Sequence, residues 1–518
     1  MAALTLDDVV TTTAAVAATR SRTAKRDAIA GLLTRAGEDE VGLVAAWLAG
    51  TPRQRRTGVG WRSLTDLPAP ADQPSLGVLD VDRALDALEQ DSGPGSAGRR
   101  RDRLHALMRA ATAEEQSFLR RLLTGELRQG ALDGVVLDAV AAAHQLPLDL
   151  VRRAAMLGGS LASVAVAAHT GGAAALQAFG LELMRPLRPM LAASAPDLES
   201  ALAGLDPPWL VDAKLDGIRI QVHRAGDEVR VWSRSLDEIT ARVPEVVATV
   251  RQLPGERLVL DGEALAVDEH GRAVAFQDSA SLAARHQREQ TAGQGQGLGC
   301  WFFDLLHRDG TDLLDAPATE RAAQLAEVAG DLVVPRLVTA DAEEAARFSA
   351  DALAAGHEGV VVKASTGRWE AGRRGGAWVK VKPRHTVDLV VLAVEHGSGR
   401  RSGLLSNIHL GARDPRTGGF VMLGKTFKGM TDEMLAWQTE RFRSLAVEDS
   451  PWVVERGPWV VPLRPEQVVE IAFDGVQRST RYPAGMALRF ARVLRYRDDK
   501  TADEADTVDT VRALAAGR

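Results

Sequence analysis

The N-terminal third of the chain is dominated by alanine, leucine and valine at helical spacing, interrupted by polar loops. The segment 134–144 (GVVLDAVAAAH) is typical, because its apolar side chains cover one broad face and few of its residues resist helix. Two stretches stand out as loops: 51–61 (TPRQRRTGVGW), and 91–103 (DSGPGSAGRRRDR), which we expect to be mobile around its Gly-Pro-Gly centre. The pattern predicts an all-α region.

The pattern changes after 184–190 (MRPLRPM), whose two prolines interrupt helix and suggest a domain junction. In 217–234 (GIRIQVHRAGDEVRVWSR) apolar and polar residues alternate, and Ala225-Gly226 turns the chain into a second strand. Further strand-like segments, with helical stretches between them, lie at 257–267, 359–363 and 377–382. This part of the chain is predicted to be α+β.

From residue 387 onward the pattern is strand-rich again, through VDLVVLAVEHG, NIHLGAR, FVMLGKTF and VVEIAFDGV. Short strands between glycine and aspartate turns fit a small β-barrel. A chain of 518 residues is too long for one core and suits about three domains. We therefore expect an all-α domain over 1–183, an α+β domain over 184–386 and a β-barrel domain over 387–518.

Composition removes several classes of protein. The single cysteine, Cys300, cannot build a disulfide framework or a four-cysteine zinc site. The chain lacks the basic start and apolar run of a signal peptide and any apolar stretch of about 18 residues, so we expect a cytoplasmic protein with no membrane partner. The net charge of −6 shows no global basic field, but nucleic-acid binding needs only one basic face.

One lysine stands out as a candidate nucleophile. In 213–219 (AKLDGIR), Lys214 ends an apolar strand and precedes Asp-Gly, so its amine would lie where the chain turns. A lysine with a pKa of about 10.4 is a poor nucleophile until cations or burial lower that pKa. In 377–383 (AWVKVKP) Lys380 and Lys382 share one strand face, which suits a phosphate clamp. By itself, Lys-x-Asp-Gly is most often a surface lysine beside a turn.

Acidic residues accompany these lysines. In 260–265 (LDGEAL) Asp261 and Glu263 lie on one side of a strand, and in 357–363 (HEGVVVK) Glu358 precedes a strand that ends in Lys363. Carboxylates and lysines gathered over one sheet are costly unless something mediates between them. A nucleoside triphosphate with Mg²⁺ would, because acids hold the metal and lysines hold the phosphates. Each charged segment taken alone could be an exposed strand end. That interpretation explains poorly why four such segments occur in one domain.

These segments, in this order, resemble the motifs of the covalent nucleotidyltransferase superfamily, and specifically of the larger ATP-dependent DNA ligases with a helical DNA-binding domain. The motifs are Lys214-Leu-Asp-Gly217, Ser233-Arg234, Asp261-Gly-Glu263 with Phe302-Phe-Asp-Leu305, Glu358-Gly-Val-Val-Val-Lys363, Trp378-Val-Lys-Val-Lys382 and Arg497-Asp-Asp-Lys500. An ordered set is far more specific than any single member. The resemblance implies an adenylation (nucleotidyltransferase) domain followed by an OB-fold domain.

The resemblance implies a role for each motif residue. Lys214 would take AMP as a phosphoramidate, Glu263 would contact the ribose and bind metal together with Glu358, and Phe303 would stack on the adenine. Arg497 and Lys500 would orient the pyrophosphate leaving group from a separate, mobile domain. The other nucleotide-site residues would be Asp212, two arginines on the nucleotide or the nick phosphate (Arg219 and Arg234), and three lysines on the phosphates (Lys363, Lys380 and Lys382).

Two N-terminal loops would add DNA contacts. The loop 123–130 resembles one in the helical domain of larger ligases and carries Arg128, and Arg55 and Arg56 lie in the loop 51–61. Solvated arginines on helix-connecting loops remain the alternative for both. Asp237 stands where larger relatives often have glutamate near a nick-sensing metal, so no such site is assigned.

The activity implied is the sealing of nicks in double-stranded DNA with ATP and Mg²⁺: lysyl-AMP forms, AMP passes to the 5′-phosphate, and the 3′-hydroxyl displaces it. We expect a monomer, with a sliding clamp as a candidate partner; replication, repair and recombination all stay open. The alternatives are an RNA ligase or capping guanylyltransferase, a non-catalytic nucleic-acid-binding protein, and an NAD⁺-dependent ligase. The last carries a four-cysteine zinc module, which one cysteine cannot supply.

Overall fold

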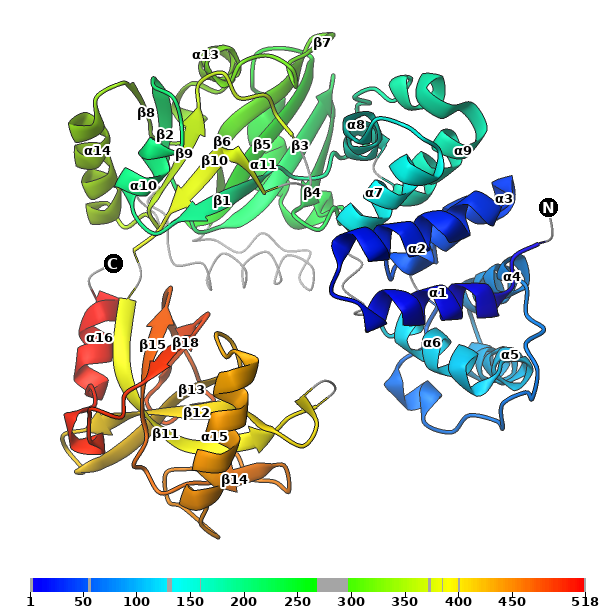
Figure 1. Ribbon diagram of the computed structural model, residues 1–518. Coiled ribbons are helices and arrows are strands. Elements are labelled where there is room, and N and C mark those ends of the chain that lie inside the picture. The colour runs from blue at the N-terminus through cyan, green and yellow to red at the C-terminus, as the bar shows by residue number, and fades with distance from the viewer. Residues whose placement is uncertain are drawn as a thin grey trace.

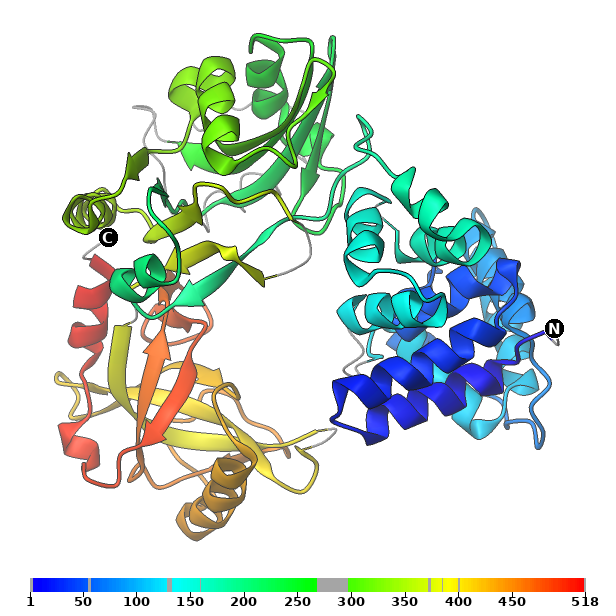
Figure 2. The same ribbon diagram turned by 45° about the horizontal axis from the view of Figure 1, so that its top comes forward.

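The computed structural model describes residues 3–54, 57–127, 133–158, 160–267, 297–370, 374–383, 385–398 and 401–516. A helical region, a middle region with two sheets and a barrel region follow one another and curve into a C shape (Figures 1 and 2). The two ends of the C approach each other where the Arg20 guanidinium lies 3.5 Å from the Asp432 carboxylate. The domain boundaries expected at 183/184 and 386/387 remain predictions.

The N-terminal region is helical, as predicted. Its elements are α1 (Leu6–Ala18), α2 (Arg22–Arg35), α3 (Glu38–Leu48), the 3₁₀ helix η1 (Trp61–Leu64), α4 (Val78–Gln90), α5 (Ser96–Ala110), α6 (Ala113–Leu123), α7 (Asp133–Ala143), α8 (Leu148–Gly158) and α9 (Leu161–Gln177). Capping boxes fix the starts of α1 and α6, at Thr5 and Thr112. The apolar faces meet in one core around Trp47 and Phe118, both fully buried.

The prediction of a long mobile loop over 91–103 is wrong. Helix α5 begins at Ser96, directly after Gly95, whose φ of 76° suits glycine. The Asp91 carboxylate accepts hydrogen bonds from Arg99 and Arg103, at 3.0 and 2.9 Å. These arginines lie four residues apart on one helix face, so the acid that precedes the helix stabilises its first turns.

The middle region contains two five-stranded sheets. The first has the strand order β1 (Leu191–Ala195), β10 (Arg374–Val381), β9 (Val360–Ala364), β2 (Trp209–Ala213) and β8 (Arg336–Thr339). The second has the order β4 (Glu228–Ser233), β3 (Ile218–Ala225), β5 (Arg257–Val267), β6 (Gly297–Arg308) and β7 (Thr311–Asp312). The strands predicted over 217–234, 257–267, 359–363 and 377–382 are therefore confirmed, as is the turn at Gly226.

Helices cover the outer face of each sheet. The first sheet packs on α10 (Leu198–Ala203) and α14 (Ala342–Ala354). The second packs on α11 (Pro244–Arg251) and α13 (Ala318–Ala329), with the 3₁₀ helices η2 (Thr240–Arg242) and η3 (Gly330–Leu332) nearby. The inner faces of the two sheets approach each other around Trp369 and Trp378, which leaves a cleft between β2, β5, β6 and β10.

The C-terminal region is a β-barrel, as predicted. One sheet has the order β13 (Gly419–Thr426), β12 (Leu405–Asp414), β11 (His385–His396), β15 (Val468–Phe473) and β18 (Arg492–Tyr496), with β14 (Val460–Pro462) on β11. A ribbon of β16 (Gly475–Arg478) and β17 (Met486–Arg489), the helices α15 (Asp432–Leu445) and α16 (Val508–Ala516), and the 3₁₀ helix η5 (Ala502–Glu504) complete it. Leu410, Phe442 and Ile471 are buried in its core.

The junction between the helical and middle regions is held by a buried histidine. The backbone N–H of Met184 donates to His223 Nδ1 at 3.0 Å, and that of Leu187 donates to Gln221 Oε1 at 2.6 Å. His223 and Gln221 contact each other at 3.0 Å.

Among the residues described, no helix is long and apolar enough to span a bilayer.

We expect His223 to make the fold sensitive to acid. Burial, helped by nearby His307, lowers its pKa from 6.5 to about 3. Between those values the unfolded chain binds a proton that the folded chain does not, so stability falls as pH falls, by at most about 1.4 kcal/mol per pH unit. His223→Asn should remove this component, seen as a flatter dependence of unfolding midpoint on pH between 6.5 and 4.5. His396→Asn, at an exposed position, is the control; equal slopes for all three proteins would contradict the prediction.

Candidate active site

A cavity of about 530 Å³ lies between the two sheets and the barrel. Its wall contains most of the residues that the sequence singled out: Asp212, Lys214, Arg219, Arg234, Glu263, Phe303, Lys363, Lys380 and Lys382. Residues far apart in the chain therefore meet at one place. This volume is in the range of ordinary small-molecule sites.

Lys214 lies directly after β2, where the chain leaves the first sheet. Its backbone N–H donates to Gly359 O at 2.8 Å, and its carbonyl accepts from Glu358 N–H at 2.9 Å. Gly359 has φ of 139°, and a Cβ there would lie 2.1 Å from Val381 O. The glycine after Glu358 is therefore required for the turn that fixes the lysine backbone.

The Lys214 amine is paired with a carboxylate. Lys214 Nζ forms an ion pair with Glu358 Oε2, and Lys382 Nζ donates to Glu358 Oε1 at 2.5 Å. Burial works against ionisation of Glu358, yet Lys214 and Lys382 hold its pKa below the ordinary value. Glu358 is 7% exposed and lies behind the two amines. The carboxylate is thus charged and shared.

Glu263, on β5, points into the same cavity. The backbone N–H of Gly217 donates to Glu263 Oε1 at 3.2 Å. Gly217 lies so close to β5 that a Cβ would be 2.5 Å from Ala264 O. Burial raises the pKa of Glu263 to about 7, against the opposing effects of Lys214 and Arg219. A ligand that binds the charged form of Glu263 must therefore compensate for the free energy that burial of this carboxylate costs.

An arginine and two aromatic rings form the next part of the wall. Arg219 binds both carboxylate oxygens of Asp261, at 3.1 and 2.7 Å, and donates to Met190 O at 2.6 Å. Its guanidinium lies 5.4 Å from the centre of the Phe303 ring. Phe303 also meets Trp378 edge to face, with ring centres 5.8 Å apart. Phe303 thus presents a half-exposed aromatic surface to the cavity.

A buried triad supports this wall from below. Asp212 pairs with Lys363 Nζ and with Arg336 Nη2, each at 2.7 Å. Burial would raise the pKa of Asp212, but Arg336 and Lys363 hold it below its usual value. Lys363 Nζ also donates to Phe303 O at 2.8 Å and lies 4.4 Å from the Trp378 ring centre. Its charge is therefore already neutralised, and it fixes the aromatic wall.

The strand β10 presents its lysines as predicted. Lys380 and Lys382 line the cavity with Trp378, while Val379 and Val381 pack on the helices behind the sheet. Lysines are scarce in this chain: of its 63 lysines and arginines only eight are lysines, and four of those line this cavity. An arginine supplies positive charge but cannot lose its proton to act as a nucleophile.

Three family models match the chain: the DNA ligase N terminus over 59–141, the ATP dependent DNA ligase domain over 189–382 and the ATP dependent DNA ligase C terminal region over 401–500. A probable DNA ligase of Beutenbergia cavernae is 61% identical, over 98% of this chain and 99% of its own length. DNA ligase B of Mycobacterium tuberculosis is 55% identical, again over 98% and 99%. The chain belongs to the ATP-dependent DNA ligases.

A solved structure named Pmar-Lig_Pre covers 95% of this ligase with a TM-score of 0.62 and 19% identity, which shows a shared fold. The resemblance inferred from the motifs is therefore confirmed. So is the architecture of a helical N-terminal region, a nucleotidyltransferase domain and a C-terminal OB-fold domain.

Two of the ligase's motif residues lie away from the cavity in this arrangement. Arg497 Nη1 and Lys500 Nζ both bind Asp388 Oδ2, at 2.9 and 2.6 Å, near the start of β11. Asp499 occupies the other side of the Arg497 guanidinium. The two cations at the end of the barrel domain are therefore held beside the connection to the middle domain.

The barrel instead presents other residues, which the sequence reasoning missed. Arg489 Nη1 binds Asp216, the acid of the Lys-x-Asp-Gly segment, at 2.6 Å. Phe490 and Asp474 line the cavity, and the Asp474 carboxylate lies 3.6 Å from Lys382 Nζ. No local pattern marks Arg489 and Asp474, because Asp216 and Lys382, which they contact, are more than ninety positions away in the chain.

Arg55, Arg56 and Arg128, expected to contact DNA, lie outside the described residues. Parts of their loops border a second cavity together with Ser235, Leu236 and Asp237; these parts are Gly50, Thr51, Pro52, Gln54, Thr57, Leu122, Leu123 and Gly125. The helical loops and the segment after Ser233-Arg234 thus meet. Among the described residues no three metal-ligating side chains cluster. Glu263 and Glu358 suit an ion held largely by substrate phosphates, as Mg²⁺ often is.

We expect Asp212→Asn to destabilise the ligase strongly, because it leaves Lys363 and Arg336 buried without their shared counter-charge. Breaking such a buried pair costs about 3–5 kcal/mol. Denaturant unfolding followed by circular dichroism measures the change, and Asp206→Asn, an exposed acid before β2, serves as the matched control. A variant as stable as the control would show that the triad does not hold the wall.

Proposed function

We propose that this ligase seals nicks in duplex DNA by carrying AMP on Lys214. The support is the convergence of one amine, two carboxylates and three further lysines on a cavity with an aromatic wall. Lys214 follows directly on the end of β2, and its backbone N–H and carbonyl are both hydrogen-bonded to the turn at Glu358 and Gly359. Its position suits a nucleophile that must be held in line with a phosphorus atom.

In the proposed first step the Lys214 amine, after losing a proton, attacks the α-phosphorus of ATP. The P–N bond forms as the bond to the β-phosphate oxygen breaks, and pyrophosphate leaves. Phe303 stacks on the adenine, and Glu263 binds the ribose. Lys380 and Lys382 hold the phosphates, while Lys363 and Asp212, paired with each other, position the aromatic wall. Mg²⁺, held by Glu358 and Glu263, would neutralise phosphate charge.

In the later steps AMP passes from Lys214 to the 5′-phosphate of the nick, and the 3′-hydroxyl then displaces AMP. Arg234 suits a contact with the nucleotide or the nick phosphate, because it is exposed at the cavity wall. Arg219 also lines the cavity and would make the same kind of contact. The contacts of Arg489 with Asp216 and of Phe490 with the cavity suit the stage in which the barrel faces DNA. Arg497 and Lys500 would replace them over the cavity when pyrophosphate must be oriented.

The DNA would be held by the three domains around the inside of the C, with Arg55, Arg56 and Arg128 on the helical side. Binding through phosphates is insensitive to sequence and weakens with salt. Action as a monomer, location in the cytoplasm and recruitment by a sliding clamp remain predictions. Comparing ATP with GTP, and nicked DNA with nicked RNA, measures the preference for nucleotide and substrate.

Incubation with ATP labelled at the α-phosphate tests the covalent step. The wild-type ligase should acquire acid-labile, alkali-stable label. Lys214→Ala should acquire none, because the remaining residues of the site cannot supply the nucleophile that the substitution removes. Lys25→Ala, at a lysine of the helical region, should label like the wild type. Equal labelling of Lys214→Ala would refute the assignment; intact mass, higher by one adenylate, provides the second readout.

The two proposed arrangements of the barrel predict separable defects. Arg497→Ala should slow lysyl-AMP formation about a hundredfold, the loss typical when a charge-stabilising group is removed. It should leave the sealing of a nick that already carries a 5′-adenylate near the wild-type rate. Rapid-quench measurements of the two reactions check this, with Arg495→Ala, exposed on β18 two residues before Arg497, as control. Equal slowing of both reactions would exclude a role confined to the first step.

A further inference from the structure

Two phenylalanines of the barrel are exposed next to cations. Phe427, after β13, is 55% exposed, and Phe490, after β17, is 59% exposed. The Arg401 guanidinium lies 5.9 Å from the Phe427 ring centre, and Lys428 Nζ lies 5.3 Å from that of Phe490. The guanidinium of Arg489 also lies 5.8 Å from the Phe490 ring centre. We name these five residues the two-phenylalanine surface.

Hydrogen bonds hold the two turns of this surface together. Thr426 Oγ1 donates to Ala491 O at 2.6 Å, and the Val493 N–H donates to Lys428 O at 2.9 Å. Gly429 permits this approach, because a Cβ there would lie 2.2 Å from Val493 O. The turn after β13 is therefore bonded on both sides of the turn that carries Phe490.

Both rings are held in place from the backbone. Arg401 Nη1 donates to Phe427 O at 3.0 Å, so the arginine beside the ring also fixes its main chain. Phe490 has φ of +56°, a left-handed conformation that a bulky side chain rarely adopts. Such outliers concentrate at functional sites, where the surrounding structure maintains them. The surface is thus built, and not a loose loop that happens to expose a ring.

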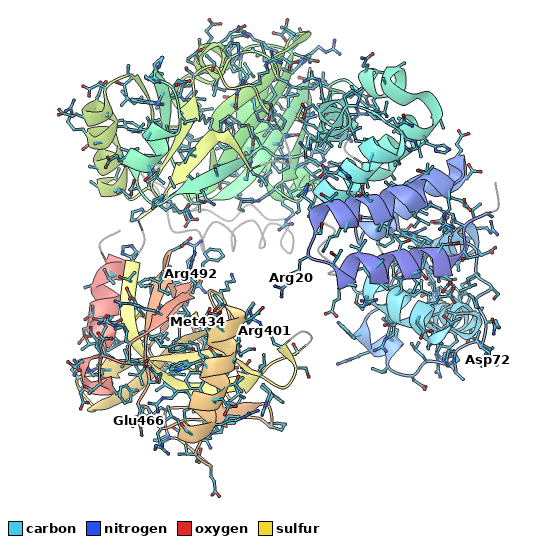
Figure 3. The ribbon with its side chains drawn as sticks, in the orientation of Figure 1. Arg20, Asp72, Arg401, Met434, Glu466 and Arg492 are labelled. Carbon is cyan, nitrogen blue, oxygen red and sulfur yellow. The ribbon has the colours of Figure 1, made fainter. Side chains whose placement is uncertain are left out.

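The position of the surface indicates its ligand. Phe490 lines the nucleotide cavity and Phe427 does not, so the second ring lies beyond the reaction centre. Arg401 lies on the side of the barrel that faces the helical region across the inside of the C (Figure 3). A ligand that reaches from the cavity past Phe427 must offer anionic groups to the cations and flat or apolar groups to the ring. The sugar-phosphate backbone and base edges of duplex DNA offer both.

We propose that Phe427, supported by Arg401, is a contact for the duplex flanking the nick, outside the cavity that binds the nucleotide. This inference rests on the proposed function. It assigns the ring to DNA binding and not to chemistry: Phe427 would pack on the sugar or base face, and Arg401 would neutralise a phosphate. Substitution should therefore weaken the binding of nicked DNA and spare the transfer of AMP to Lys214.

The test uses the full-length ligase and a nicked duplex that already carries the 5′-adenylate, so that the first step is bypassed. Phe427→Ala should raise the Kd, measured by fluorescence anisotropy, and the KM for sealing about tenfold, with kcat nearly unchanged. Phe427→Trp should restore binding. Trp459→Ala removes a ring that is 55% exposed on the same domain and should bind DNA like the wild type.

Salt dependence separates the ring from the charge. Phe427→Ala should leave the slope of log Kd against log salt unchanged. Arg401→Ala should reduce this slope by about one, the value expected for the loss of one phosphate contact. A wild-type Kd for Phe427→Ala on this protein-free DNA would overturn the proposal and leave a protein partner as the ligand of the surface. Parallel loss of lysyl-AMP formation would also overturn it, as a general defect. Fluorescence anisotropy measures DNA binding even if the ligase forms no lysyl-AMP. Failure of the proposed function and failure of the proposed DNA contact therefore give different results.

Discussion

The sharing of one carboxylate by two amines is the interaction on which the site depends. Glu358 is nearly buried and charged because Lys214 and Lys382 bind its two oxygens. Those lysines lie at the ends of different strands, β2 and β10, so the pair also fixes where the strand ends meet. The buried carboxylate could not remain charged there without these two cations, because burial alone works against its ionisation. The charge that stabilises the free site is the same charge that a triphosphate must compete for.

This competition explains why the site needs both signs of charge. Three cations of the cavity wall are each paired with a carboxylate: Lys363 with Asp212, Arg219 with Asp261, and Lys382 with Glu358. Under the proposed mechanism, phosphates that enter this site would displace carboxylates from amines, and the freed carboxylates would then favour a divalent cation. Glu263 and Glu358 would hold such an ion with few protein ligands, since no three metal-ligating side chains cluster among the described residues.

Local rules predicted what depends on neighbours in sequence. The period of two placed Lys380 and Lys382 on one face of β10, and the turn at Gly226 joined the predicted hairpin. The loop over 91–103 was predicted wrongly, because the glycine-rich start hid the ion pairs between Asp91 and the arginines of α5. Pairs formed across the fold had no local signal at all. Arg336 meets Asp212 across 124 residues and Arg489 meets Asp216 across 273.

The same limit explains the end of the chain. The sequence marks Arg497 and Lys500 by their motif, but it cannot show which surface they occupy, since that depends on the orientation of a whole domain. Here both bind Asp388, at the first strand of the barrel, while Phe490 lines the cavity and Arg489 binds Asp216. The Arg497–Lys500 pair and the Arg489–Phe490 pair lie at different places on the barrel. Under the proposed mechanism, rotation about the connection before β11 would exchange them, and one cavity would then serve nucleotide activation in one orientation and DNA joining in the other.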